Sequence, residues 1–134
     1  MAALGKITQD FPPGPNNPRN SEGGCATPAD GRILFAYSRS NGDGGRDDAP
    51  SDIVSVSSPD GGNTWEDERI ITTAAKDNAQ NVMSVTLRRM ANEDLGLFYC
   101  IRAAANDART FLRRSGDDGQ TWSAPSACIE PEGY

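Results

Sequence analysis

The sequence contains no histidine among its 134 residues. Histidine-based acid–base catalysis and histidine-ligated metals are therefore excluded for this chain. Its three cysteines, Cys25, Cys100 and Cys128, form no Cys-x-x-Cys pair, and an odd number does not complete a disulfide framework. We expect all three to be free thiols buried in strands, and we expect neither a metal nor a cofactor.

Long apolar runs and an excess of basic residues are also missing. No apolar stretch reaches the ~20 residues that a membrane helix needs, and the start of the chain lacks the apolar core of a signal peptide. The compartment is therefore unknown. With 19 acidic against 13 basic side chains, the net charge of −6 argues against non-specific binding to nucleic acid or to anionic membranes.

What the chain does contain is an internal repeat. Residues 58–65 and 115–122 both fit Ser-x-Asp-x-Gly-x-Thr-Trp, and they start 57 residues apart. From ordinary residue frequencies, one such match has a chance of about one in a million per start position. A pair of matches is therefore a repeat and the main signal of the fold. The fixed positions are Ser58, Asp60, Gly62, Thr64 and Trp65 in the first copy, and Ser115, Asp117, Gly119, Thr121 and Trp122 in the second.

These residue types suit a tight corner between two strands. The short side chains of Ser58 and Asp60 can accept backbone N–H groups and close a turn. Gly62 can take a positive φ without strain, and Trp65 brings a large apolar ring that needs a covering neighbour. We therefore interpret each copy as a structural strand–turn–strand unit.

The remaining pattern predicts short strands and no helix. After an extended, proline-rich lead-in over 1–18, we expect strands at 21–27, 32–38, 52–58 and 68–73, and a second set at 81–90, 95–102, 108–115 and 122–129. Loops are expected at 41–50 and 103–107. Short apolar strands separated by turn signals indicate an all-β antiparallel architecture.

The repeated motif resembles the Asp-box, or bacterial neuraminidase repeat, of the sialidase superfamily. Segments 17–23, 31–37 and 80–84 also look like parts of bacterial sialidase-like proteins, so the resemblance covers 11–134. It implies two four-stranded antiparallel blades of a six-bladed β-propeller, with the box between the third and fourth strands. The blades would be 19–75, with box 58–65, and 76–134, with box 115–122. The remaining blades are missing, so the chain is part of a longer protein or assembles with others.

Topology predicts where a site can lie. Connections in an antiparallel meander alternate between the two ends of a sheet. The boxes then share one end with the turns between first and second strands. Loop 41–50 and the starts of the first strands lie at the other end, where we expect any chemistry.

The resemblance assigns candidate roles at that other end. Sialidases hold the substrate carboxylate with three arginines, because planar guanidinium groups bind carboxylates in a fork. Arg19 matches the first of these, although it could simply tie down the lead-in. Asp48, or its neighbour Asp47, matches the catalytic acid, with solvated loop carboxylates as the alternative. Arg39 ends the second strand and either lines the pocket or is a surface charge.

Weaker candidates for recognising sugar hydroxyls are Glu22, Gln80 and Asn81, whereas Asp107 and Arg109 are expected to form a surface ion pair. The tyrosine nucleophile that sialidases use, its glutamate partner and two further arginines would come from later blades. Tyr37 and Tyr99 are expected in the core, and Tyr134 has no matching context.

The sequence therefore predicts the N-terminal part of a sialidase-like exo-glycosidase that acts on terminal sugars of glycans, inactive as this chain alone. The alternative is a non-catalytic Asp-box propeller that binds carbohydrate or protein, because fold does not fix function. A third hypothesis is a degraded remnant whose uncovered apolar faces invite aggregation.

Overall fold

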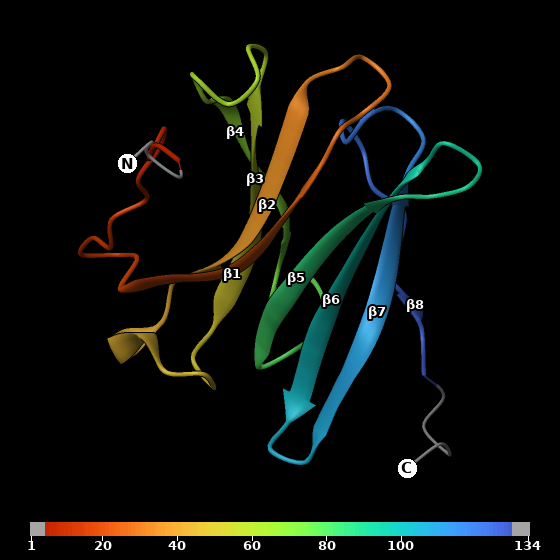
Figure 1. Cartoon of the computed structure of the whole chain (residues 1–134). Coiled ribbons are helices and arrows are strands. Elements are labelled where there is room, and N and C mark those ends of the chain that lie inside the picture. Colours follow the sequence, from red (N-terminus) through yellow and green to blue (C-terminus); the bar gives the residue numbers. More distant parts are fainter. Residues whose placement is uncertain (1–4, 130–134) are drawn as a thin grey trace.

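The computed structural model describes residues 5–129 and contains two antiparallel sheets of four strands each, lying side by side (Figure 1). The first sheet has the order β1-β2-β3-β4 and the second the order β5-β6-β7-β8. The strands of the first are β1 Arg19–Ala26, β2 Ile33–Ser40, β3 Ser51–Ser58 and β4 Glu66–Thr73. Those of the second are β5 Asn81–Arg89, β6 Leu95–Ala104, β7 Asp107–Ser115 and β8 Ser126–Ala127. The expected all-β antiparallel architecture is confirmed.

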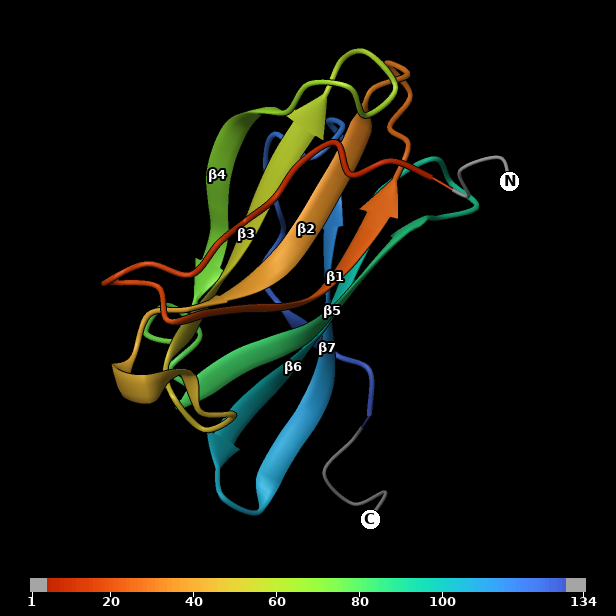
Figure 2. The same cartoon turned by 60° about the vertical axis from the view of Figure 1, so that its left-hand side comes forward.

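The core lies between the two sheets. Alternate residues of β2 and β3 face the second sheet because side chains in a strand alternate between its faces, and Leu34, Ala36 and Ile53 are buried there. The second sheet supplies Val82, Val85, Leu87, Leu95, Leu97, Tyr99 and Ile101. Strand β1 lies against β5 near the middle of this contact (Figures 1 and 2).

The lead-in forms no strand over 5–18, apart from a single bridge between Gly14 and Asn17. It crosses the face of the first sheet that points away from the second (Figure 2). Phe11 packs there on Phe35 and Tyr37, with ring centroids 6.0 and 5.0 Å apart. The expectation of an extended lead-in holds for the described part, while residues 1–4 lie outside it.

The end of the second sheet differs from the prediction. The strand expected over 122–129 is reduced to β8, two residues that pair with Phe111 and Leu112. Pro125 has no N–H to give to the ladder, so pairing cannot run on from Trp122. Residues 130–134, including Tyr134, lie outside the described part.

The prediction of a loop at 103–107 is also wrong. Strand β6 continues to Ala104 and β7 starts at Asp107, so Ala105 and Asn106 alone make the turn. Loop 41–50, by contrast, lies between strands as expected and carries one short 3-10 turn, η1 Asp43–Gly45. Within residues 5–129 there is no helix with the length and apolar character to span a bilayer.

The cysteines are free thiols, but they are not buried as expected. Cys25 on β1 is exposed, Cys100 on β6 is half-buried, and Cys128 is exposed just after β8. The side chains alternate along β1 and β6, and these two thiols fall on positions that do not face the core between the sheets.

Candidate functional site

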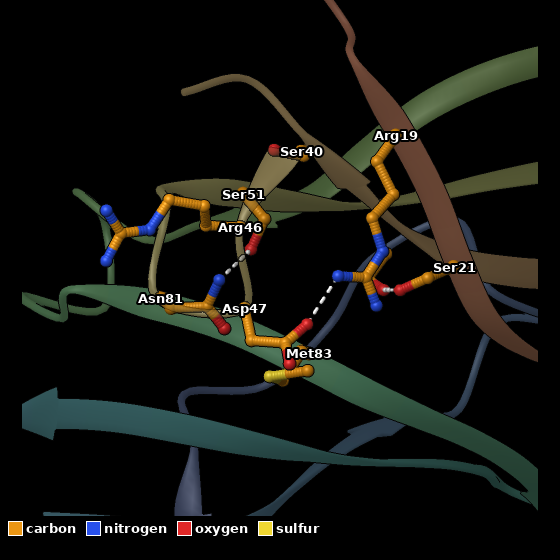
Figure 3. Close-up of a pocket in the computed structure, with 9 residues that line it drawn as sticks. Arg19, Ser21, Ser40, Arg46, Asp47, Ser51, Asn81 and Met83 are labelled. Atoms are coloured by element: carbon orange, nitrogen blue, oxygen red, sulfur yellow. Dashed lines mark hydrogen bonds and ion pairs between the residues drawn. The ribbon is translucent and has the colours of Figure 1, made fainter. Parts of the chain in front are cut away.

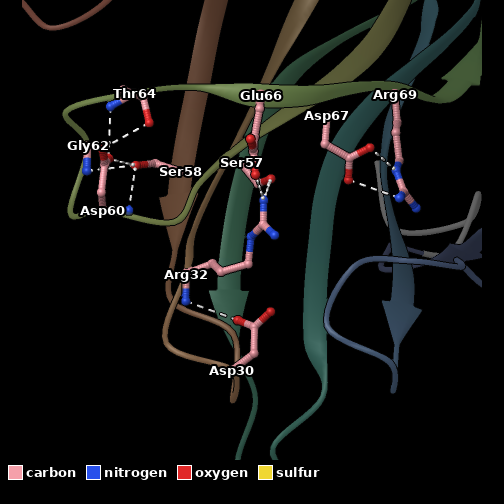
Figure 4. Close-up of polar contacts among 10 residues, drawn as sticks. All are labelled: Asp30, Arg32, Ser57, Ser58, Asp60, Gly62, Thr64, Glu66, Asp67 and Arg69. Atoms are coloured by element: carbon pink, nitrogen blue, oxygen red, sulfur yellow. Dashed lines mark hydrogen bonds and ion pairs between the residues drawn. The ribbon is translucent and has the colours of Figure 1, made fainter.

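The two boxes have the same internal geometry. In the first, Ser58 Oγ accepts the Gly62 N–H at 2.8 Å, and Asp60 accepts the N–H and hydroxyl of Thr64 at 2.8 and 2.9 Å (Figure 4). The second box makes the equivalent bonds: Ser115 with Gly119 at 2.8 Å, and Asp117 with Thr121 at 2.9 and 2.6 Å. The expected roles of serine and aspartate in closing the turn are confirmed.

Backbone and electrostatics agree with this structural role. Gly62 and Gly119 have φ of +90° and +87°, the positive values that the motif predicts. Hydrogen bonds from Thr121, its hydroxyl first, lower the pKa of Asp117 to about 2. The pKa of Asp60 is lowered too, chiefly by the backbone N–H of Thr64. The box carboxylates are therefore fully engaged in holding their own turns.

The boxes and the predicted site lie at opposite ends of the sheets. We call the end with the boxes and the β1–β2 turn the box end; Arg32 of that turn donates to Glu66 at 2.9 Å (Figure 4). We call the end with loop 41–50, the 74–80 link and the β6–β7 turn the loop end. Because β3 runs from the loop to the first box, the expected separation is confirmed.

Arg19 and Asp47 meet at the loop end. Arg19 begins β1 and forms an ion pair with Asp47, and it also donates to the carbonyl oxygen of Gly45 at 3.4 Å. Gly45 lets the loop approach this closely: it has a φ of +58°, and a Cβ there would lie 3.0 Å from Cβ of Arg19. The hydrogen bond to Arg19 holds the pKa of Asp47 below its usual value and raises the pKa of Arg19.

Asp48 points elsewhere, although it is the neighbour of Asp47. Both of its oxygens bind Arg46, at 3.0 and 2.9 Å. Of the two aspartates that the sequence could not separate, Asp47 is thus the one beside Arg19.

Arg39 is not brought together with Arg19. It donates to Glu68 at 2.9 Å and lies 3.6 Å from Asp52. Ser40 is the residue paired with Arg19 across β1 and β2, so Arg39, one position earlier, projects from the other face of the sheet.

The three weaker candidates also lie in different surroundings. Glu22 accepts hydrogen bonds from the hydroxyls of Ser21 and Ser38, near Arg19. Asn81 begins β5 and is buried, donating to the Ala49 carbonyl at 2.5 Å and to Ser51 Oγ at 3.0 Å. Gln80 is exposed, and its backbone N–H donates to the carbonyl oxygen of Arg102 at 2.8 Å.

A small hollow at the loop end brings together three of the candidates, Arg19, Asp47 and Asn81. Arg19 and Asp47 point toward one another in it, while Arg46 points away (Figure 3). Both first strands are irregular beside it, with register shifts between Ser21 and Gly23 and between Met83 and Thr86. Such bulges often re-aim side chains at functional sites. The lining residues are Arg19, Ser21, Ser38, Ser40, Arg46, Asp47, Ser51, Asn81 and Met83.

A buried ionic network that the sequence did not suggest joins the second sheet to the 74–80 link, and Arg113 of this network also donates to Thr72 Oγ1 of β4 at 3.3 Å. Arg113 on β7 pairs with Asp77 of the 74–80 link, with side chains only 5% and 1% exposed. Tyr99 donates to Asp77 at 2.7 Å and accepts from Arg113 at 2.9 Å, and its burial raises its pKa.

The expectations for two tyrosines and one ion pair also hold. Tyr99 and Tyr37 are buried core residues, and Arg109 pairs with Asp107 at 2.8 Å.

No three histidine, cysteine, aspartate or glutamate side chains of residues 5–129 are grouped so that they could hold a metal ion. The chemistry that the hollow at the loop end offers comes from the guanidinium groups of Arg19 and Arg46, the carboxylate of Asp47 and several neutral hydroxyl and amide groups.

Comparison with known proteins agrees with these features. The BNR repeat-like domain family matches residues 17–133, and the chain therefore belongs to this family. Among solved structures, the Hadza microbial sialidase Hz136 is similar with a TM-score of 0.70 and 20% identity. The match covers 84% of this chain and 26% of that one, so the chain spans about a quarter of the sialidase. At this identity the likeness shows a shared fold. No curated protein matches the chain.

Proposed function

We propose that this chain is part of a sialidase-like glycoside hydrolase that acts on terminal sugars of glycans. Its two sheets would be successive blades of a six-bladed propeller, 19–75 and 76–134. The observation that carries the proposal is the meeting of Arg19 and Asp47 at the loop end, beside two irregular first strands. Family membership and the sialidase-like fold support it.

In this proposal Arg19 binds the carboxylate of an acidic sugar and Asp47 supplies the proton to the leaving oxygen. A proton donor near neutral pH needs a raised pKa, whereas the hydrogen bond to Arg19 lowers that of Asp47. A substrate carboxylate that takes over Arg19 would remove this effect. The pair thus holds the acid ionised until substrate arrives.

We expect the purified chain to have no glycosidase activity, because a nucleophile and two arginines must come from elsewhere. Turnover of a fluorogenic sialoside by the chain alone would refute this. In a longer protein that contains this chain, Asp47→Asn should lower kcat by about 10²–10⁴-fold. Asp48→Asn is the matched variant and should retain activity within a few-fold. The reverse result would move the acid to Asp48.

The second candidate is a non-catalytic module that binds carbohydrate or protein through the same end. Its support is that Arg19 is already neutralised by Asp47 and that Tyr37 and Tyr99 are buried in packing contacts. A longer protein that binds sialosides with unchanged affinity after Asp47→Asn, and hydrolyses none, would favour this module.

A further inference from the structure

The arginines that lack an ion pair lie on one face of the second sheet. Arg88, Arg102 and Arg114 form no ion pair with a residue of 5–129, whereas every other arginine does. Arg88 and Arg114 pair with Gly96 from its two sides, and Arg102 lies an even number of residues further along β6. Side chains alternate along a strand, and Leu97 faces the core. The three arginines therefore project from the face that points away from the first sheet, which we call the outer face.

Apolar side chains occupy the middle of the outer face. A Cβ at Gly96 would lie 2.8 Å from Met90 Sδ, 3.2 Å from Phe98 Cε2 and 3.3 Å from Leu112 Cδ1. Phe98 is half-buried, and Leu112 is buried although it lies outside the core between the sheets. None of the outward positions of β5, β6 and β7 is acidic. Aromatic residues, methionine and arginine are enriched at protein interfaces, so the composition of the outer face is that of an interface.

The internal repeat indicates what such a face binds. Ile33 and Leu95 each pair with the serine of a box, so the residues that follow them along β2 and β6 correspond to one another. Ala36 corresponds to Phe98 in this alignment, and Ala36 is fully buried against the second sheet. The outer face thus corresponds to a face that another sheet of the same kind covers in this molecule. We therefore expect a sheet of this kind as its occupant.

The lead-in side of the first sheet offers a surface that complements the outer face. Ile7 is 89% exposed there, and its neighbours Lys6 and Thr8 bind the first box. Acidic side chains outnumber basic ones on the lead-in and on the outward positions of β2, β3 and β4. They are Asp10, Asp52 and Glu68, against Lys6 and Arg39. This negative excess is opposite in sign to the unpaired arginines of the outer face.

We propose that the outer face of the second sheet binds the lead-in side of the first sheet of a second copy of this chain. Phe98 and Ile7 supply the apolar contact, and the unpaired arginines face the acidic side. The contact joins two different surfaces, so each copy binds one neighbour on either side, and the copies form rings or open chains. It is independent of the chemistry proposed at the loop end, because neither Arg19 nor Asp47 takes part in it.

Sedimentation velocity of the purified full chain, from micromolar to millimolar concentration, tests this contact. Oligomers should grow with concentration and dissociate as salt is added, because salt screens the charges. Phe98→Glu should raise the dissociation constant about 30-fold or more, and Arg88→Gln with Arg114→Gln about two- to fivefold. Arg89→Gln is the matched control, because Arg89 is the neighbour of Arg88 on the opposite face, and it should leave association unchanged.

A mixture of two variants identifies the partner as a second copy. Phe98→Glu removes the outer face and Ile7→Glu removes the lead-in side, so each variant alone should be monomeric, with an unchanged Tm. Together they should form a one-to-one complex, because each variant keeps the surface that the other lacks. A chain that stays monomeric up to millimolar concentration overturns the proposal. Association that Phe98→Glu leaves unchanged, or two variants that do not combine, would also overturn it.

Discussion

The two boxes are alike inside and different outside. The second box rests on the first sheet: Asp118 accepts the Ala29 N–H at 2.8 Å, and Gln120 accepts from Arg69 at 2.6 Å. The first box rests on the lead-in: Asn63 accepts from Lys6 at 2.8 Å, and Trp65 donates to Thr8 at 3.4 Å. Asn63 and Gln120 occupy the same position of the motif, and each accepts from a basic side chain.

This comparison shows what the lead-in does. The face of β6 that carries Leu97 and Tyr99 packs on the first sheet, whereas the matching face of β2, with Phe35 and Tyr37, packs on Phe11. The first sheet covers this face of the second sheet, and the lead-in covers the corresponding face of the first sheet. We call residues 5–18 the cap, because they cover this face of the first sheet.

The largest expected effect comes from the buried network, which has no counterpart in the first sheet. Arg113 lies 57 residues after Val56, the matching position. Arg113→Met leaves Asp77 buried without its cation and should lower the free energy of unfolding by about 3–5 kcal/mol. Val56→Ala should cost only about 1–2 kcal/mol. Urea unfolding measures both.

The double variant Asp77→Asn, Arg113→Met checks the cause. It removes the unpaired buried charge of Asp77 and should recover part of the lost free energy of unfolding. If the double variant is as unstable as the sum of the single variants, the network is not the reason for the effect.

The next largest effect is a difference in the stability lost when each of the two box glycines is replaced by alanine. Both have positive φ, so alanine at either costs about 1–2 kcal/mol. A Cβ at Gly119 would also lie 2.8 Å from Leu34 Cδ2, whereas at Gly62 the nearest atom is 3.8 Å away. Gly119→Ala should therefore be about 1–3 kcal/mol more destabilising than Gly62→Ala. Equal losses in thermal unfolding would show that the second box does not press on the first sheet.

A smaller effect is expected at the cap. Phe11→Ala removes two ring contacts and should cost about 1–2 kcal/mol. Amide hydrogen exchange should speed up in β2 more than in β6, and binding of a hydrophobic dye should rise. Ile7→Ala is the control, because Ile7 is 89% exposed. Unchanged exchange in β2 would show that the lead-in does not cover the first sheet.

The smallest effect is the response of the boxes to acid. A lowered folded-state pKa stabilises the protein above the unfolded value near 3.9, and the gain is lost as the pH falls toward the folded value. For Asp117 that value is about 2, so its contribution should fade between about pH 4 and pH 2. Asp117→Asn should therefore lower Tm at pH 6 and much less at pH 2. A loss independent of pH would rule out the charge as the source.

Much of this fold could be predicted from the chain because its signals are local. The alternating or continuous apolar strands β2, β3 and β6 and the fixed residues of the boxes each act within a few positions. The predictions failed where strands end. Pro125 interrupts the last strand, and the two-residue turn at 105–106 replaces a longer loop.

The site was less predictable because it depends on the directions in which neighbouring side chains point. Asp47 and Asp48 are neighbours, and only the turn of loop 41–50 decides which one reaches Arg19. The alternation of side chains between the two faces of a strand could have shown that Ser40 rather than Arg39 faces the second sheet. The partnership of Arg113 with Asp77 had no such signal, because the two lie 36 residues apart in the sequence.

The position of Asp77 has a consequence for proteolysis. The only covalent passage between the two halves of the described chain runs through 74–80, and there Asp77 is clamped by Arg113 and Tyr99. A protease that cuts this passage would still leave Asp77 anchored and the apolar contact between the halves intact. The nicked molecule should run as one species in native gel electrophoresis and separate only in denaturant.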